Sequence, residues 1–212
     1  MYTPNNFAVE DVSEVHALMR ARPFAILVTH GADGLMATHL PTVLKVDGET
    51  PLGRIECHVA RPNPHWRRFT PQADALMIFQ GPEAYIRPGW YPSKAEHAKV
   101  VPTWNYAVGH AYGRLEAVQD QAWLIQHVSE LTEQQEAPLP EPWSTADAPE
   151  SFLAVMARGI VGLSFTITRI EGKAKMSQNR EPRDRAGVVC GLTARGLGED
   201  REIAALVERL NR

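Results

Sequence analysis

Arg61 is one of several residues in this sequence whose surroundings could bind an anion. It ends a predicted strand, GRIECHVAR, and the chain then enters a predicted short helix at Asn63-Pro64. A guanidinium beside the backbone N–H groups of a helix start can hold a phosphate dianion. The alternative is an ordinary surface arginine near a turn, with no ligand.

The polar segment KAKMSQNREPRDR, residues 173–185, is a second candidate for binding a charged ligand. Gln178 and Asn179 add amide donors to a surplus of cations. This mixture suits a polar, planar, phosphorylated ligand, whereas a platform for nucleic acid would interleave aromatic residues. The alternative is a solvated basic loop. The cations are Lys173, Lys175, Arg180, Arg183 and Arg185, against the carboxylates Glu181 and Asp184.

Thr38, His39 and Thr42 surround a proline on the second predicted strand, LMATHLPTVLKV. Proline removes a hydrogen bond from a strand ladder, so Pro41 predicts a sheet edge or a break in pairing. Exposed backbone at such a break can hydrogen-bond a ligand. The alternative is an edge strand that is merely protected against aggregation.

Several common active-site motifs are missing from the sequence. It contains no GxGxxG, GxxxxGK[ST] or GxSxG, which argues against dinucleotide, P-loop and α/β-hydrolase sites. The histidines show no HExxH or HxH spacing, and Cys57 alternates with Ile55 and Val59 toward a predicted core. We therefore predict no metal site and no cysteine nucleophile, and the catalytic residues stay unassigned.

The composition is that of an ordinary globular protein. The 212 residues carry a net charge of −3 and are 44% hydrophobic, which favours one domain over residues 1–212 and argues against a protein that coats nucleic acid. Cys57 and Cys190 are far apart and outside any CxxC motif, which favours reduced thiols. Neither a signal peptide nor a membrane-spanning run is visible, so we expect a cytoplasmic protein.

The predicted elements are mainly strands joined by short turns. Helices are expected from Asp11 to Arg22, after Asn63, from Asp120 to Gln134, from Pro149 to Arg158 and at the C-terminus. Strands with short connections favour a small antiparallel barrel with helical decoration. The predicted strands are PFAILVTH, LMATHLPTVLKV, GRIECHVAR, ALMIFQ, AYIRP, VPTWNYAVGHAYG and IVGLSFTITRI.

The strand VPTWNYAVGHAYG, residues 101–113, has one face of large residues and one of small residues. We expect Trp104, Tyr106 and Tyr112 to anchor this strand in the core. The opposite face, from Asn105 to Gly113, consists of residues small enough for another group to approach it closely. The alternative is that Gly109 and Gly113 only relieve a bend in a barrel.

Five stretches in order along the chain resemble one known family. They are MYTPNNF, HLPT, HVARPNPHW, VPTWNY with His110 and Gly113, and KMSQNR leading to DRAGVVCGL. The family is the PaiB type, described as FMN-binding negative transcriptional regulators. The resemblance implies an FMN-binding split β-barrel, similar to flavin reductases and pyridoxamine-phosphate oxidases, with an antiparallel Greek-key arrangement.

The resemblance also implies a homodimer with one FMN per subunit. DNA enters as a partner only through the family's description. The phosphate would be bound from the second and third strands, and the ring system would be completed near the dimer interface. The small face from Asn105 to Gly113 would lie against the partner subunit or the edge of the flavin. The residues implied are Thr38, His39, Thr42, His58, Arg61, Trp104, Asn105, Lys175, Gln178, Asn179 and Arg180.

The use of the flavin is left open by the sequence. One alternative to a regulator is a flavin-dependent oxidoreductase that acts on a small molecule, with His39 or His58 as the proton donor. Another is a haem-handling split barrel, since eight histidines are available. A dimeric scaffold with an empty pocket is a further alternative.

Overall fold

The computed structural model describes residues 1–48 and 50–211, and the chain folds into two compact units. Three strands run from one unit into the other: β5 (Ala75–Ile86), β6 (Thr103–Val118) and β7 (Ile160–Lys175). The expectation of one domain over the whole chain stays a prediction. Unit 1 comprises Met1–Val15, Gln80–Gly109 and Glu171–Arg212, and unit 2 comprises His16–Phe79 and His110–Ile170.

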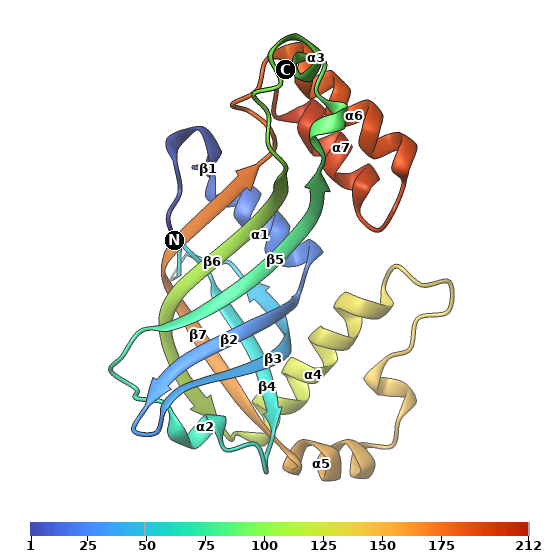
Figure 1. Ribbon diagram of the computed structural model, residues 1–212. Helices are drawn as coiled ribbons and strands as arrows, with labels where there is room; N and C mark the ends of the chain where they lie inside the picture. Colours follow the sequence, from blue (N-terminus) through green and yellow to red (C-terminus); the bar gives the residue numbers. More distant parts are fainter. Residues whose placement is uncertain (49, 212) are drawn as a thin grey trace. The chain divides into compact units, whose positions relative to one another are not determined.

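Seven strands form one antiparallel sheet in the order β1-β7-β4-β3-β2-β5-β6 (Figure 1). β6 also pairs with β7, so six of the strands close on themselves as a barrel. The predicted fold class, mainly β with helices, is confirmed. The other strands are β1 (Ala8–Val9), β2 (Phe24–Gly31), β3 (Gly34–Lys45) and β4 (Arg54–Ala60).

In unit 2, β3 changes its partner at Pro41. It pairs with β2 from Gly34 to Pro41, and its pairing with β4 begins at Thr42, opposite Cys57. Beyond Cys57, β4 continues alongside β7, with His58 opposite Gly162. Because proline cannot donate to a ladder, the break in pairing falls where the sequence predicts it.

The core of unit 2 lies between these strands. Cys57 is fully buried in it, as its alternation with Ile55 and Val59 predicts, and burial raises the pKa of its thiol. The neutral thiol is a poor nucleophile, which agrees with a structural role. Large, fully buried side chains of this core include Leu27, Ile55, Met77, Phe79, Leu163 and Phe165.

Unit 2 also contains the helices α2 (His65–Arg68), α4 (Gln121–Glu136) and α5 (Glu150–Arg158). Asp120 caps α4 by accepting a hydrogen bond from the backbone N–H of Trp123 at 2.8 Å. Trp123 packs on Gly162 of β7 so closely that a Cβ there would lie 2.2 Å from its ring. This contact fixes the face of α4 that turns toward the barrel.

Unit 1 contains β1, the far ends of the three shared strands and a pair of packed helices. The helices are α6 (Pro182–Arg195) and α7 (Asp200–Arg209), with the short α3 (Ser93–His97) beside Asp184 of α6. Helix α1 (Val12–Ala21) begins in unit 1 and ends in unit 2. The buried core of unit 1 is formed by Ile86, Tyr91, Met176, Val188, Leu192, Ile203 and Val207.

The basic segment 173–185 is not one solvated loop, which was the alternative that the sequence left open. Its first residues end β7 at Lys175, and α6 begins at Pro182. Helix α6 was not predicted because it contains Gly187 and Gly191, and glycine lowers helix propensity. Both are needed for packing, since a Cβ at Gly187 or Gly191 would lie within 2.2 Å of Trp90.

The faces of β6 are the reverse of those predicted. Asn105 and Ala111 are fully buried, whereas Trp104 is 50% exposed. A Cβ on Gly113 would lie 2.0 Å from the carbonyl oxygen of Thr166 in β7. The small face therefore packs inside the chain, which favours the alternative of glycine as a barrel residue and contradicts the expected interface on that face.

No helix in residues 1–48 and 50–211 is long and apolar enough to cross a membrane. Within the same residues, no three His, Cys, Asp or Glu side chains come together as a metal site.

Candidate functional site

Unit 1 gathers cations where β7 ends. Lys173 Nζ lies 5.2 Å from the ring centroid of Tyr106, and Lys175 Nζ donates to Thr103 Oγ1. Burial lowers the pKa of Lys175, and the positive charges of Lys173 and Arg180 lower it further, against the effect of Tyr106. A group of cations that repel one another is stabilised by an anion.

Arg180 lies over the ring of Tyr91, with its guanidinium carbon 4.7 Å from the ring centroid. Tyr91 is 2% exposed, and its hydroxyl forms no hydrogen bond of regular geometry in the described part of the chain, although the Arg180 guanidinium lies close enough to act on it. A buried polar atom without a partner costs about 1–3 kcal/mol, so it is an indicator of a site. Tyr91 is absent from the residues that the sequence suggested, because a lone tyrosine carries no motif.

The turn between Lys175 and Arg180 is held by its own side chains. Gln178 accepts a hydrogen bond from the backbone N–H of Met176 at 2.6 Å and donates to the carbonyl of Ala174 at 2.7 Å. Asn105 donates to the hydroxyl of Ser177 at 3.0 Å, and Ser177 has a left-handed backbone with φ of 61°. Gln178 and Asn105 thus position the turn, and Asn179 beside them is exposed.

In unit 2, Thr38 is tied to a buried histidine. His65 is fully buried and bridges two threonines: its Nδ1 lies 2.7 Å from Thr38 Oγ1 and its Nε2 lies 2.8 Å from Thr29 Oγ1. Burial lowers the pKa of His65, so the ring is neutral and donates to one hydroxyl while it accepts from the other. His65 begins α2, and Asn63 Oδ1 accepts from its backbone N–H at 3.0 Å.

Thr42 and His39, the other two residues predicted around Pro41, differ in whether their side chains can reach a ligand. Thr42 is buried, and its hydroxyl donates to the carbonyl of Pro23 at 2.8 Å. His39 is exposed and stacks on Phe24, with the ring centroids 6.3 Å apart. His39 is therefore open to a ligand, while the Thr42 hydroxyl is used within the fold.

Arg61 is engaged by the protein itself. Its guanidinium donates to the carbonyls of Arg158 and Ile160 at 2.7 and 2.9 Å and to Gln119 Oε1 at 2.9 Å. These bonds tie the end of β4 to the start of β7. An arginine has five N–H donors, so some remain for a ligand, but the position of the side chain is set by structure. A phosphate contact at Arg61 stays a prediction.

His58 is paired with another histidine of unit 2. Its Nδ1 lies 3.1 Å from Nε2 of His127, which is 1% exposed on α4 and stacked on Trp123 at 5.2 Å. Burial lowers the pKa of both rings, and the charge of His58 also lowers that of His127, which falls to about 4. Both rings are therefore neutral near pH 7.

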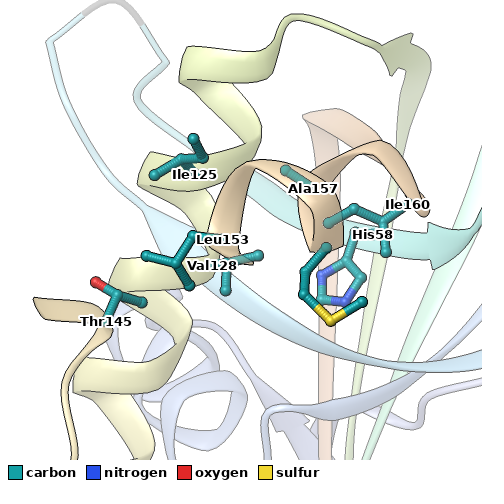
Figure 2. A pocket seen from close by; sticks show the side chains of 8 residues that line it. His58, Ile125, Val128, Thr145, Leu153, Ala157 and Ile160 are labelled. Carbon is teal, nitrogen blue, oxygen red and sulfur yellow. The ribbon is translucent and has the colours of Figure 1, made fainter. Parts of the chain in front are cut away.

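A cavity of about 260 Å³ lies beside this pair, and His58 forms part of its wall (Figure 2). No sequence pattern predicts this cavity, because β4 is far along the chain from α4 and α5. Its apolar wall is formed by Ile125, Val128, Leu153, Met156, Ala157 and Ile160.

Known proteins resemble this chain in sequence and in structure. The family described as "Putative FMN-binding domain" matches residues 1–169. The protease synthase and sporulation protein PAI 2 of Bacillus subtilis is 31% identical over 208 residues, covering 98% of this chain and 97% of that protein. An uncharacterized protein of Emericella nidulans is also 31% identical, over 241 residues that cover 98% of this chain and 96% of that protein.

Solved structures support the fold. A conserved hypothetical protein from Mycobacterium tuberculosis has a TM-score of 0.59 at 12% identity, with 85% of this chain and 94% of that chain covered. The flavocytochrome Anf3 from Azotobacter vinelandii has a TM-score of 0.54 at 15% identity, with coverage of 85% and 75%. The predicted cofactor, FMN, is confirmed by the family match, and the chain belongs to the PaiB-type FMN-binding family.

Proposed function

We propose that this chain is a homodimeric flavoprotein that binds the phosphate of FMN with Lys175 and Arg180. One observation carries the proposal: in the described part of the chain, neither cation has an ion pair with a carboxylate. Both are partly buried, and their mutual repulsion lowers the pKa of Lys175 beyond the effect of burial. A phosphate dianion would reverse that repulsion and accept charge-assisted hydrogen bonds.

The neighbouring residues complete the proposed phosphate site. The buried hydroxyl of Tyr91 would gain a partner, and the exposed amide of Asn179 would add a donor. Gln178 and Asn105 would act indirectly, by holding the turn that carries these groups. When bound, FMN supplies the capacity for hydride or electron transfer, and the protein supplies binding and orientation.

The unit 2 residues that the family resemblance implies stay predictions of that resemblance. Within unit 2, the Thr38 hydroxyl is oriented by His65 and the ring of His39 is exposed. The hydroxyl of Thr42 and the guanidinium of Arg61 form hydrogen bonds within the fold. Trp104, half exposed in unit 1, is proposed as a further ring contact.

Removing the two cations should abolish most FMN binding. We expect Lys175→Met and Arg180→Met each to weaken FMN binding about tenfold to 100-fold, because a charge-assisted hydrogen bond contributes about 1.5–3 kcal/mol. Quenching of flavin fluorescence measures the affinity. Arg183→Met is the matched control, since this cation of the same segment is paired with Glu96 and Glu181. Equal FMN affinity in all three variants would refute the site.

The homodimer is supported by an apolar face of α5. Phe152, Val155 and Met156 are each at least half exposed, and their spacing places them on one side of the helix. Apolar surface of this kind is typical of an interface. Light scattering of the full chain should give twice the mass of 23.6 kDa, and a mass of one chain at micromolar concentration would contradict the dimer.

The alternative functions that the sequence leaves open can each be tested. Rapid bleaching of the flavin by NAD(P)H without oxygen would support an oxidoreductase, and a Soret band would support haem handling. A regulator that contacts DNA should shift promoter fragments on a gel, with binding that weakens steeply as salt rises.

A further inference from the structure

The cavity beside His58 differs in character from a phosphate site. His58 and Thr145 are its polar wall residues, and no charged side chain lines it. Thr145 Oγ1 is already paired with Ser129 Oγ at 2.8 Å. The other polar group is the His58 ring, which Figure 2 shows among apolar side chains.

The contact between His58 and His127 determines which nitrogen of His58 carries the proton, and therefore whether the ring presents a donor or an acceptor to the cavity. The 3.1 Å contact between His58 Nδ1 and His127 Nε2 needs one donor and one acceptor. His127 Nδ1 is buried and has no partner in the described part of the chain, so it must be either an unpaired N–H or an unpaired lone pair. Buried N–H groups without partners are the rarer of the two in proteins. His127 Nε2–H therefore donates to His58 Nδ1.

This assignment fixes the other nitrogen of His58. A neutral imidazole carries one proton, so His58 with an accepting Nδ1 has its proton on Nε2. In the described part of the chain, Nε2 makes no hydrogen bond. The cavity thus offers one N–H donor within an apolar wall.

We propose that this cavity binds a small neutral apolar molecule that carries one hydrogen-bond acceptor, such as an aromatic ketone or aldehyde, with His58 Nε2–H as the donor. Apolar walls exclude an ionic ligand, which would lose its hydration without a counter-charge. A cavity of about 260 Å³ exceeds the roughly 150 Å³ that holds benzene, so a ligand of roughly ten non-hydrogen atoms fits. The proposal is independent of the proposed phosphate site.

Two probes of equal size test the donor. 4-Methylacetophenone carries a carbonyl, and 4-isopropyltoluene has the same number of non-hydrogen atoms without an acceptor. We expect the full chain to bind the ketone about tenfold more tightly than the hydrocarbon, and His58→Phe to prefer the hydrocarbon, because the buried carbonyl then has no donor. Equal binding of the two probes to the unaltered chain would overturn the proposal.

The protonation of the rings is measured directly, without a variant, by nitrogen-15 NMR of the histidine side chains. We expect the proton of His58 on Nε2 and that of His127 on Nε2. A proton on His58 Nδ1 would turn an acceptor toward the cavity and would overturn the proposal. This reading holds even if His58→Phe fails to fold.

A third comparison locates the probe. Leu153 lines the cavity, whereas Ser151 is exposed on the same helix and lies outside the cavity wall. Leu153→Trp should weaken ketone binding by more than tenfold, and Ser151→Trp should leave it unchanged. Ketone binding that survives Leu153→Trp would place the site elsewhere.

The same samples separate this proposal from the phosphate site. Ketone affinity should be unchanged in saturating FMN. Displacement of the ketone by FMN would contradict the claim that the cavity is separate from the FMN site. Loss of FMN binding with intact ketone binding would refute only the proposed function.

Discussion

A Gly113→Ala variant should lose about 3 kcal/mol of unfolding free energy. The added Cβ would lie 2.0 Å from the carbonyl oxygen of Thr166, which is backbone of a neighbouring strand and not a flexible side chain. Relief requires β6 and β7 to separate, which strains the pairing that closes the barrel. Overpacking of a rigid core costs about 1–3 kcal/mol, and this contact is with backbone, which places it at the upper end. Urea unfolding of the full chain measures the change.

Gly48→Ala is the matched control for this prediction. A Cβ there meets nothing within 4 Å, so we expect a change within about 0.5 kcal/mol. An insoluble Gly113→Ala protein beside a soluble control would agree with the prediction. Equal stability of the two variants would contradict the close approach of Thr166 in β7 to Gly113 in β6.

His127 should make the fold less stable as pH falls. Its pKa is lowered to about 4 in the folded chain, from 6.5, first by burial and then by His58. Between these values the unfolded chain binds a proton that the folded chain does not, so stability is lost as pH falls below 6.5. The slope for this one group is about 1.4 kcal/mol per pH unit, which amounts to about 2 kcal/mol between pH 7 and pH 5.

The measurement compares unfolding free energies at pH 7 and pH 5 in two variants. His127→Phe should remove about 2 kcal/mol of the loss on acidification, because phenylalanine cannot take up a proton. His30→Gln, which replaces an exposed imidazole, should keep the full loss. If His127→Phe loses as much stability on acidification as the unaltered chain, His127 is not a buried neutral ring.

The sequence predicts the strands and most helices because their patterns are local. The break at Pro41 and the capped start of α4 follow from single residues whose backbone chemistry is fixed. The faces of β6 could not be predicted, because alternation tells the two faces apart without saying which one is inside. Close approach of β7 at Gly113 decides it, and that contact joins distant segments.

The site shows the same limit. The cations of the KMSQNR segment are visible in the sequence, and the structure leaves Lys175 and Arg180 without carboxylate partners in its described part. No sequence pattern predicts that Tyr91 lies under Arg180. The bridge from His65 to Thr29 and Thr38 is equally invisible in the sequence, because such contacts form only on folding. Trp123 and His127 are four residues apart in a predicted helix, and this spacing on one helix face was a signal that the histidine packs beside the tryptophan.

A comparison of FMN with riboflavin tests the central claim most directly, because the two ligands differ only in the phosphate. If Lys175 and Arg180 bind that group, the full chain should prefer FMN by more than about 100-fold, and the Lys175→Met/Arg180→Met double variant should retain less than about tenfold. Equal affinity of the unaltered chain for the two flavins would contradict the claim that this basic turn holds the cofactor.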